Sequence, residues 1–189
     1  MCVGKPYEVL VEHLIATRST EIIANGCPEH TSILICKMLN NAQSEVKIFC
    51  NRLNHDVYNT PRVVAAFEEA MSRAVKIQII IQEAQHDPES KAVEDLSLKY
   101  PQLLSIRSCK SLDSIANLPF NFFVADGGKM YRIEPDRTRP NATACMNAEG
   151  DNNVKKLVNL FDKTIEKLEE PESRKDAPGK EPEGNSEKG

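Results

Sequence analysis

The sequence predicts an α/β protein with a mixed sheet flanked by helices on both faces. Three observations predict this fold class. Between residues 45 and 81, a strand pattern, an amphipathic helix and a largely apolar strand pattern follow one another, as in a βαβ unit with parallel strands. Two later strand patterns flank Asp126-Gly127-Gly128, a turn typical of a β-hairpin. A helix with a clean apolar stripe then ends near residue 168.

Two helices are predicted before the first strand. Over residues 7–25, apolar side chains recur loosely at helical spacing until a Gly-Cys-Pro segment ends the run. A second helix follows, and Thr31 or Ser32 is a suitable N-cap for it. It ends near residue 41, at a pair of asparagines. The chain therefore opens with a helical segment.

The predicted βαβ unit begins with a strand over residues 45–50, which is rich in β-branched and aromatic side chains. A polar loop over residues 51–59 follows. Thr60-Pro61 then supplies an N-cap and a proline at the first helical position. The next strand, residues 75–81, alternates and then becomes wholly apolar, as does a strand that is buried on both faces. We expect the two strands to be parallel neighbours.

The second half of the chain supplies the remaining elements. A helix is predicted over residues 88–100 and a short strand over residues 103–106. The hairpin strands cover residues 120–125 and 129–133, and a further strand is predicted within residues 141–146. The apolar stripe of the last helix consists of Val154, Leu157, Val158, Phe161, Ile165 and Leu168.

Composition favours one globular domain with a charged tail. Hydrophobic residues make up 40% of the chain and charged residues 28%, close to globular averages. We expect an N-terminal helical segment (residues 1–41) packed on the domain, the domain itself (42–168) and a disordered tail (169–189), because the tail has no large apolar side chain to bury. The net charge is −4, and the acidic tail supplies most of it. The nearly neutral body gives no global signal for nucleic acid, although a local basic patch stays open.

Cysteine usage and hydropathy exclude several classes of protein. The six cysteines lack the spacing of a disulfide framework, so isolated buried thiols are favoured. No CxxC pair exists, and we predict neither a metal site nor a cofactor. The apolar stretch Ile77 to Ile81, with Gln78 inside it, is far shorter than the roughly 20 residues of a membrane span. No secretory signal is recognisable at the N-terminus. We therefore expect a cytoplasmic protein without a membrane span.

Over residues 42 to 168 the chain resembles one lobe of the phospholipase D-like superfamily. The best segment is FNFFVADGGKMYRIE, residues 120–134. In active members a strand carries His-x-Lys, four residues and then Asp, and a short Gly-Ser-x-Asn-like segment follows further on. Here Asp126 fits the Asp position, but Asn121 falls at the lysine and Pro119 at the histidine. In the later segment only Asn147 matches.

This departure from the motif bears on activity. In the family the histidine attacks phosphorus, a partner histidine protonates the leaving oxygen and lysines hold the phosphate's charge. Proline has no nucleophile, and asparagine carries no charge. The resemblance therefore implies a catalytically degenerate domain that acts as a binding or assembly module for a protein or an anionic ligand. Active single-lobe members build their site between two copies, so the resemblance also implies a homodimer.

Six residues are candidates for ligand binding, and no catalytic residue is assigned. They are Asn121, Asp126, Lys129, Arg132, Asn147 and His55. His55 follows a parallel strand at its carboxyl end, where such sheets place ligands, and the two basic residues form a cluster with Arg137 and Arg139. Each candidate also has a simpler interpretation, as a turn, loop or solvated strand residue.

Two other functions stay open. One is a phosphodiesterase that uses displaced groups, for example His55 with Lys129 or Arg132. A separation of more than about 8 Å between these groups would contradict it, because proton transfer needs direct hydrogen bonding or one bridging water. The other is a nucleic-acid-binding accessory protein, which requires the basic hairpin residues to gather on one face.

Overall fold

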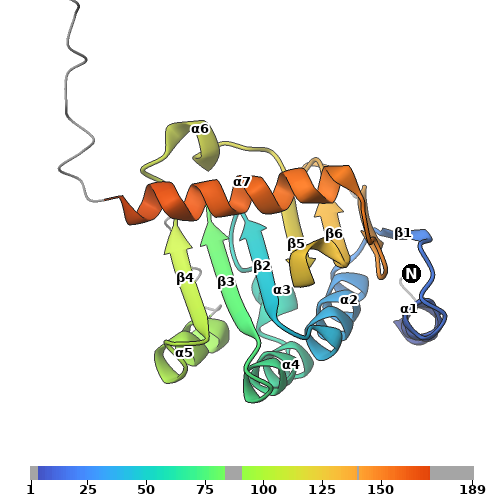
Figure 1. Ribbon diagram of the computed structural model, residues 1–189. Coiled ribbons are helices and arrows are strands. Elements are labelled where there is room, and N and C mark those ends of the chain that lie inside the picture. The colour runs from blue at the N-terminus through green and yellow to red at the C-terminus, as the bar shows by residue number, and fades with distance from the viewer. Residues whose placement is uncertain (1–3, 84–90, 140, 171–189) are drawn as a thin grey trace, which may run out of the picture.

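The computed structural model describes residues 4–83, 91–139 and 141–170, and Figure 1 shows their arrangement. The sheet has seven strands in the order β1-β7-β6-β5-β2-β3-β4. The strands are β1 (Ile22–Asn25), β2 (Glu45–Cys50), β3 (Lys76–Ile81), β4 (Leu104–Ser108), β5 (Asn121–Ala125), β6 (Met130–Glu134) and β7 (Ala142–Cys145). The helices are α1 (Gly4–Ala16), α2 (Pro28–Asn41), α3 (His55–Tyr58), α4 (Pro61–Ser72), α5 (Lys91–Lys99), α6 (Asp113–Ala116) and α7 (Asn152–Glu169), with a 3-10 turn, η1, at Asp126–Gly128.

The sheet is mixed, as the sequence predicts. β2, β3 and β4 are parallel to one another, and Ile48 pairs with Ile79 in the centre. β5 lies antiparallel to β2 on the other side, and β6, β7 and β1 continue the sheet with antiparallel pairing. The predicted parallel pair and the predicted hairpin are both confirmed.

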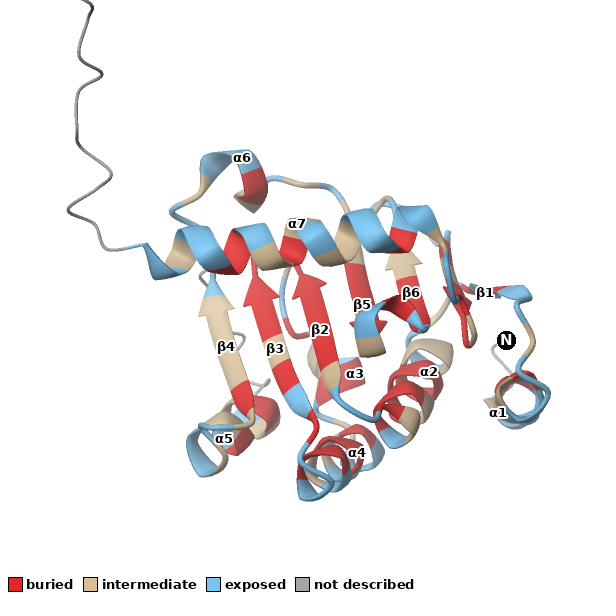
Figure 2. Ribbon diagram, in the orientation of Figure 1, coloured by how far each residue is buried: buried red, intermediate tan, exposed pale blue. Residues whose placement is uncertain are grey.

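Helices cover both faces of the sheet (Figure 1). On one face, α1, α2, α4 and α5 pack on a large core that includes Ile48 and Phe67. On the other face, α7 crosses the strands and packs with α6 on a second core that includes Phe49 and Phe161. Successive residues of β2 point to opposite faces, so Ile48 and Phe49 belong to different cores. Figure 2 shows that the central strands β2 and β3 are buried along most of their length.

The N-terminal region differs from the prediction. The predicted helix over residues 7–25 ends at Ala16 in α1, and Ile22–Asn25 form β1, which pairs with β7. The prediction was wrong there because a four-residue strand has too few positions for its alternation to be read, and its partner lies more than a hundred residues away. The next helix, α2, starts at Pro28 with Cys27 as its N-cap, so neither Thr31 nor Ser32 has the predicted capping role.

The polar segment after β2 is also more ordered than predicted. Residues 51–59 contain the short helix α3, whose N-cap Asn54 accepts a hydrogen bond from the Asp56 backbone N–H at 3.0 Å.

The structure also differs from the prediction that the cysteines are isolated thiols. Cys36, Cys50, Cys109 and Cys145 are buried free thiols as predicted, but Cys27 is disulfide-bonded.

Three further predictions depend on which residues the structure describes. The predicted disordered tail lies outside the described residues beyond residue 170. Among the described helices, none has the length and apolar character needed to cross a bilayer. The same residues contain no group of three or more His, Cys, Asp or Glu side chains arranged to hold a metal ion.

Candidate ligand cavity at the carboxyl end of β2

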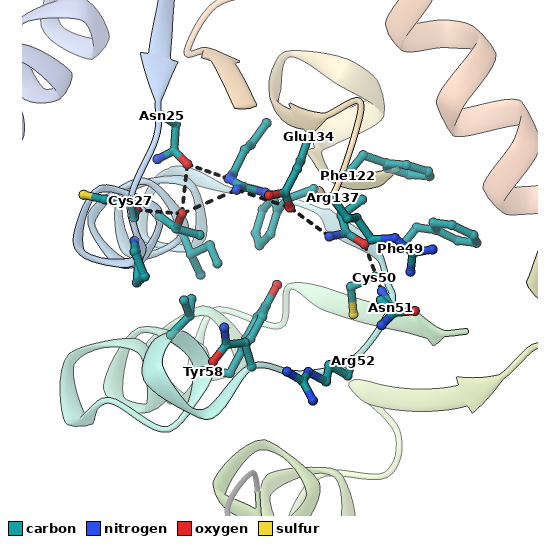
Figure 3. A pocket seen from close by; sticks show the side chains of 18 of the residues that line it. Asn25, Cys27, Phe49, Cys50, Asn51, Arg52, Tyr58, Phe122, Glu134 and Arg137 are labelled. Atoms are coloured by element: carbon teal, nitrogen blue, oxygen red, sulfur yellow. Dashed lines mark hydrogen bonds and ion pairs between the residues drawn. The ribbon is translucent and has the colours of Figure 1, made fainter. Parts of the chain in front are cut away.

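A cavity of about 460 Å³ opens at one edge of the sheet. Strand direction explains its position. The carboxyl ends of β1, β2 and β6 and the amino end of β5 meet at this edge, because Asn121 pairs with Glu134 and Phe49 pairs with Phe122. Loops at the carboxyl ends of parallel strands are where α/β sheets commonly bind ligands. Polar side chains from all four strands or the residues after them line the cavity (Figure 3).

Arg132 is at the centre of a hydrogen-bond network in the cavity wall. Its Nε donates to Asn25 Oδ1 at 3.0 Å, and one terminal nitrogen donates to Thr31 Oγ1 at 3.4 Å. The same nitrogen lies 3.7 Å from Glu134 Oε2. The Arg132 side chain is only about one-tenth exposed, so its charge is compensated mainly by Glu134. These contacts hold the guanidinium in the wall of the cavity.

Asn121 extends the network toward β2. Its Nδ2 donates to Glu134 Oε2 at 2.8 Å, and its Oδ1 accepts the backbone N–H of Asn51 at 2.9 Å. Both ends of the amide therefore have protein partners. The Asn121 side chain is thus a bridge between strands, and it also lines the cavity.

Tyr58 and Cys50 form the apolar side of the cavity. Figure 3 shows the Tyr58 ring extending from α3 toward the middle of the cavity. Tyr58 is 9% exposed, and burial, with a small contribution from Cys50, raises the pKa of its hydroxyl far above the ordinary value. Burial also raises the pKa of the Cys50 thiol to about 12. Both groups are thus protonated at neutral pH.

Three arginines stand at the mouth of the cavity. Arg52 directly follows the end of β2 and is exposed, and it has no hydrogen-bond or ion-pair partner among the described residues. Arg137 donates to Gln82 Oε1 at 3.1 Å. Arg139 is 76% exposed and lies 3.3 Å from Asp136. Including Arg132, the described lining residues carry four guanidinium groups and one carboxylate, that of Glu134.

The predicted candidates divide between two edges of the sheet. Asn121 and Arg132 line the cavity. Asp126 lies at the other end of the five-residue strand β5, roughly 15 Å away at 3.3 Å per residue. There its carboxylate accepts hydrogen bonds from the backbone N–H groups of Gln43, Ser44 and Glu45 at 2.8–3.3 Å. It therefore ties the hairpin turn to the segment that leads into β2.

Lys129 and Asn147 are at the same edge as Asp126. The Lys129 carbonyl accepts the backbone N–H of Ala148 at 2.6 Å. Asn147 Nδ2 donates to the Arg18 carbonyl at 2.8 Å. Because the hairpin reverses the chain, the residue that returns to Asn121 is Glu134, and neither Lys129 nor Asn147 is among the residues that line the cavity.

His55 lies beside the cavity. It begins α3, directly after the lining residue Asn54, and its Nε2 is 3.1 Å from Asp56 Oδ1. Its side chain is 43% exposed, and the described lining residues do not include it. The structure therefore does not assemble His55 with Lys129, which lies at the opposite edge.

Several residues that line the cavity were not predicted from the sequence as binding candidates. They are Asn25, Arg52, Tyr58 and Glu134. One signal for Arg52 was present, because Asn51-Arg52-Leu53-Asn54 is a polar run at the end of a strand in a parallel pair. Asn25 could not be found, since β1 was predicted as helix. Tyr58 looked like a loop residue, and only the short helix α3 turns it inward.

The mixed seven-stranded sheet with helices on both faces defines an α/β protein, and comparison with a solved structure supports a phospholipase D-like fold. The chain is similar to Nuc, a phospholipase D family member from Salmonella typhimurium, with a TM-score of 0.50, 10% identity and coverage of 71% of this chain and 86% of that one. It is also similar to NucT from Helicobacter pylori, with a TM-score of 0.47, 14% identity and coverage of 74% and 89%. At these identities the likeness concerns the fold alone.

A further similar structure is TrmBL2, an archaeal chromatin protein whose structure is described as showing a novel mode of DNA binding. The TM-score is 0.53 at 15% identity, over 86% of this chain. The match spans 60% of the TrmBL2 chain. No curated protein matches the sequence. Residues 28–174 match the family described as Domain of unknown function (DUF7931), and the chain belongs to that family.

Proposed function

We propose that this protein is a catalytically degenerate phospholipase D-like domain that binds a small anionic ligand in the cavity at the carboxyl end of β2. One observation carries the proposal. The described lining residues place four arginines and a single carboxylate around about 460 Å³, within the size range of small-molecule sites. Planar guanidinium groups suit phosphate and carboxylate because they donate two parallel hydrogen bonds.

The distribution of these charges supports anion binding at the mouth. Glu134 compensates Arg132 within the wall. Arg52 has no partner among the described residues, and Arg137 uses one nitrogen on a neutral amide. Two guanidinium groups thus have donors left for a ligand. Charge-assisted hydrogen bonds of this kind are the stronger ones in proteins.

The chemistry of the lining supports binding without hydrolysis. The described lining residues include neither histidine nor lysine. The raised pKa values of Tyr58 and Cys50, both caused mainly by burial, keep these groups protonated. Asn121 has both ends of its amide engaged with the protein. Since a phosphoryl transfer of the family's type needs a nucleophile and a proton donor, these side chains do not supply that route.

Calorimetric titration with inorganic phosphate at low ionic strength tests the proposal. Arg52→Gln is expected to weaken binding about tenfold or more, because it removes a charge-assisted contact worth about 1.5–3 kcal/mol. Arg107→Gln is the matched control, since Arg107 lies on β4 and pairs with Glu169 at 2.8 Å. Equal affinities for the wild type and Arg52→Gln, or no binding at all, would contradict the proposal.

Nucleic-acid binding is a second candidate, favoured by the exposed arginines at the mouth and by the likeness to TrmBL2. The hairpin supports it less, because Arg132 is buried and Lys129 lies at the opposite edge from Arg137. A single-stranded oligonucleotide that binds with a steep salt dependence would favour it.

The homodimer also stays a prediction, and light scattering during size exclusion tests it.

A further inference from the structure

The cavity has two chemically different ends. At the mouth, Arg52 and Arg137 lie near the carboxyl ends of β2 and β3, because Arg137 contacts Gln82 and the Gln82 backbone N–H donates to the Cys50 carbonyl at 3.0 Å. This end carries excess positive charge. The inner end is formed by Tyr58, Cys50 and the Arg132–Glu134 pair, whose opposite charges compensate each other.

The inner end holds a donor without a partner. The Tyr58 hydroxyl makes no hydrogen bond with any described residue, although the side chain is 91% buried and points into the cavity. Because the hydroxyl faces the cavity without a protein partner, it is available to a ligand or an ordered water. Burial keeps the pKa of this hydroxyl high, so it stays a donor at neutral pH.

An acceptor accompanies this donor. Among the described residues, the Glu134 carboxylate accepts one side-chain hydrogen bond, from Asn121, and lies 3.7 Å from Arg132. Since a carboxylate offers about four acceptor sites, it keeps the capacity to accept from a ligand. Tyr58, Arg132 and Glu134 all line this cavity, so a single ligand can reach the donor and the acceptor. A hydroxyl group, which donates and accepts at once, matches a free donor beside a free acceptor.

The inner end does not suit a second charge. Among the described residues of this end, the ionised groups are the compensated pair, and Phe49, Phe122 and Val57 add apolar surface to the lining. Moving a charge into such a site costs more than moving a hydroxyl, because a charge loses more hydration. The mouth and the inner end therefore prefer different parts of one ligand.

Building on the proposed anion-binding function, we propose that the ligand is a small phosphomonoester whose organic part carries hydroxyl groups. The phosphate lies at Arg52 and Arg137, and a hydroxyl of the organic part contacts Tyr58 and Glu134. A terminal phosphate has three acceptor oxygens for the two guanidinium groups. The volume of about 460 Å³ admits a molecule of sugar-phosphate or nucleotide size.

Calorimetric titrations with inorganic phosphate, glycerol 1-phosphate, glucose 6-phosphate and AMP test this proposal. At least one ester is expected to bind about tenfold more tightly than inorganic phosphate. Tyr58→Phe keeps the ring and removes only the hydroxyl, so it should abolish this preference for an ester over inorganic phosphate. Tyr131→Phe is the matched control, because Tyr131 is buried in the core under α7 and does not line the cavity. Thermal melts verify that both variants are folded.

The outcomes separate this proposal from the function on which it rests. Inorganic phosphate that binds in an Arg52-dependent manner, with no ester binding more tightly, would leave the proposed function standing and overturn the phosphomonoester. A preference that survives Tyr58→Phe would overturn it as well. Glucuronate, which replaces the phosphate with a carboxylate, should bind more weakly than glucose 6-phosphate, and equal affinity would contradict the assignment of a phosphate. Failure of inorganic phosphate to bind would remove both proposals.

Discussion

Asp126, which was predicted as a ligand-binding candidate, gives the sharpest test of whether such a residue serves the fold in this chain. Its carboxylate accepts hydrogen bonds from three consecutive backbone N–H groups and from the Ser44 hydroxyl at 2.9 Å. These contacts join segments that are 81 to 83 residues apart in the chain. Their loss should therefore lower stability, and it should leave the cavity at the opposite edge unchanged.

The cleanest perturbation is Asp126→Asn. Asp126 has a φ of 50°, and asparagine tolerates this left-handed conformation better than alanine does. Asparagine keeps the Oδ1 contacts but loses the charge and the Oδ2 contact with Gln43 at 2.9 Å. A hydrogen bond to a charged group contributes about 1.5–3 kcal/mol, and exposure to water reduces this. We expect a loss of about 1–2 kcal/mol in the free energy of unfolding.

Urea and thermal denaturation measure this loss. For a domain of this size, about 1 kcal/mol corresponds to a Tm shift of about 2–4 °C, so a decrease of several degrees is expected. Asp95→Asn is the matched control, because Asp95 is exposed on α5 and should change stability by less than about 0.5 kcal/mol. A wild-type Tm in Asp126→Asn, or a loss of phosphate affinity at full stability, would refute the structural role.

Three further predictions concern packing, the domain boundary and pH. Phe161 is fully buried, with its ring centroid 6.3 Å from that of Phe122, so Phe161→Ala should lower the free energy of unfolding by about 3–5 kcal/mol. Deleting residues 171–189, which have no large apolar side chain, should leave Tm nearly unchanged in the same thermal melts, and equal losses would contradict the boundary near residue 170. Burial raises the pKa of Cys50 from 9.0 to about 12, so its contribution to stability is complete below pH 9 and is lost between pH 9 and 12. Cys50→Ala should reduce the alkaline loss of stability in urea titrations, and an unchanged pH profile would contradict this.

The central part of the fold could be predicted because its signals are local. The wholly apolar end of residues 75–81 predicted a strand buried on both faces, and β3 is the middle strand of the parallel three. Asp126-Gly127-Gly128 predicted a hairpin, and all three residues have positive φ in the turn. The helical stripe around Phe161 predicted a helix packed on the sheet. In each case the pattern lies within one element.

The candidate site was less predictable because it depends on contacts between distant segments. The hydrogen bond from Arg132 to Asn25 joins residues 107 positions apart, and β1 was too short for its periodicity to be recognised. Strand direction also separates Asn121 from Asp126, although the two residues are only five positions apart in the chain. The turn moves Asp126 to one edge of the sheet and brings Glu134 back to Asn121 at the other. Neither relation follows from spacing along the chain.

Phosphorus NMR tests the central claim most directly, because it observes binding and hydrolysis in one sample. The sample contains the protein, inorganic phosphate and bis(p-nitrophenyl) phosphate, a phosphodiester. We predict that the wild type broadens the inorganic phosphate resonance, that Arg52→Gln restores most of its sharpness, and that no resonance of p-nitrophenyl phosphate appears. Growth of that monoester resonance above the protein-free rate, or an inorganic phosphate resonance unaffected by the wild type, would contradict a cavity that binds an anion without hydrolysing a diester.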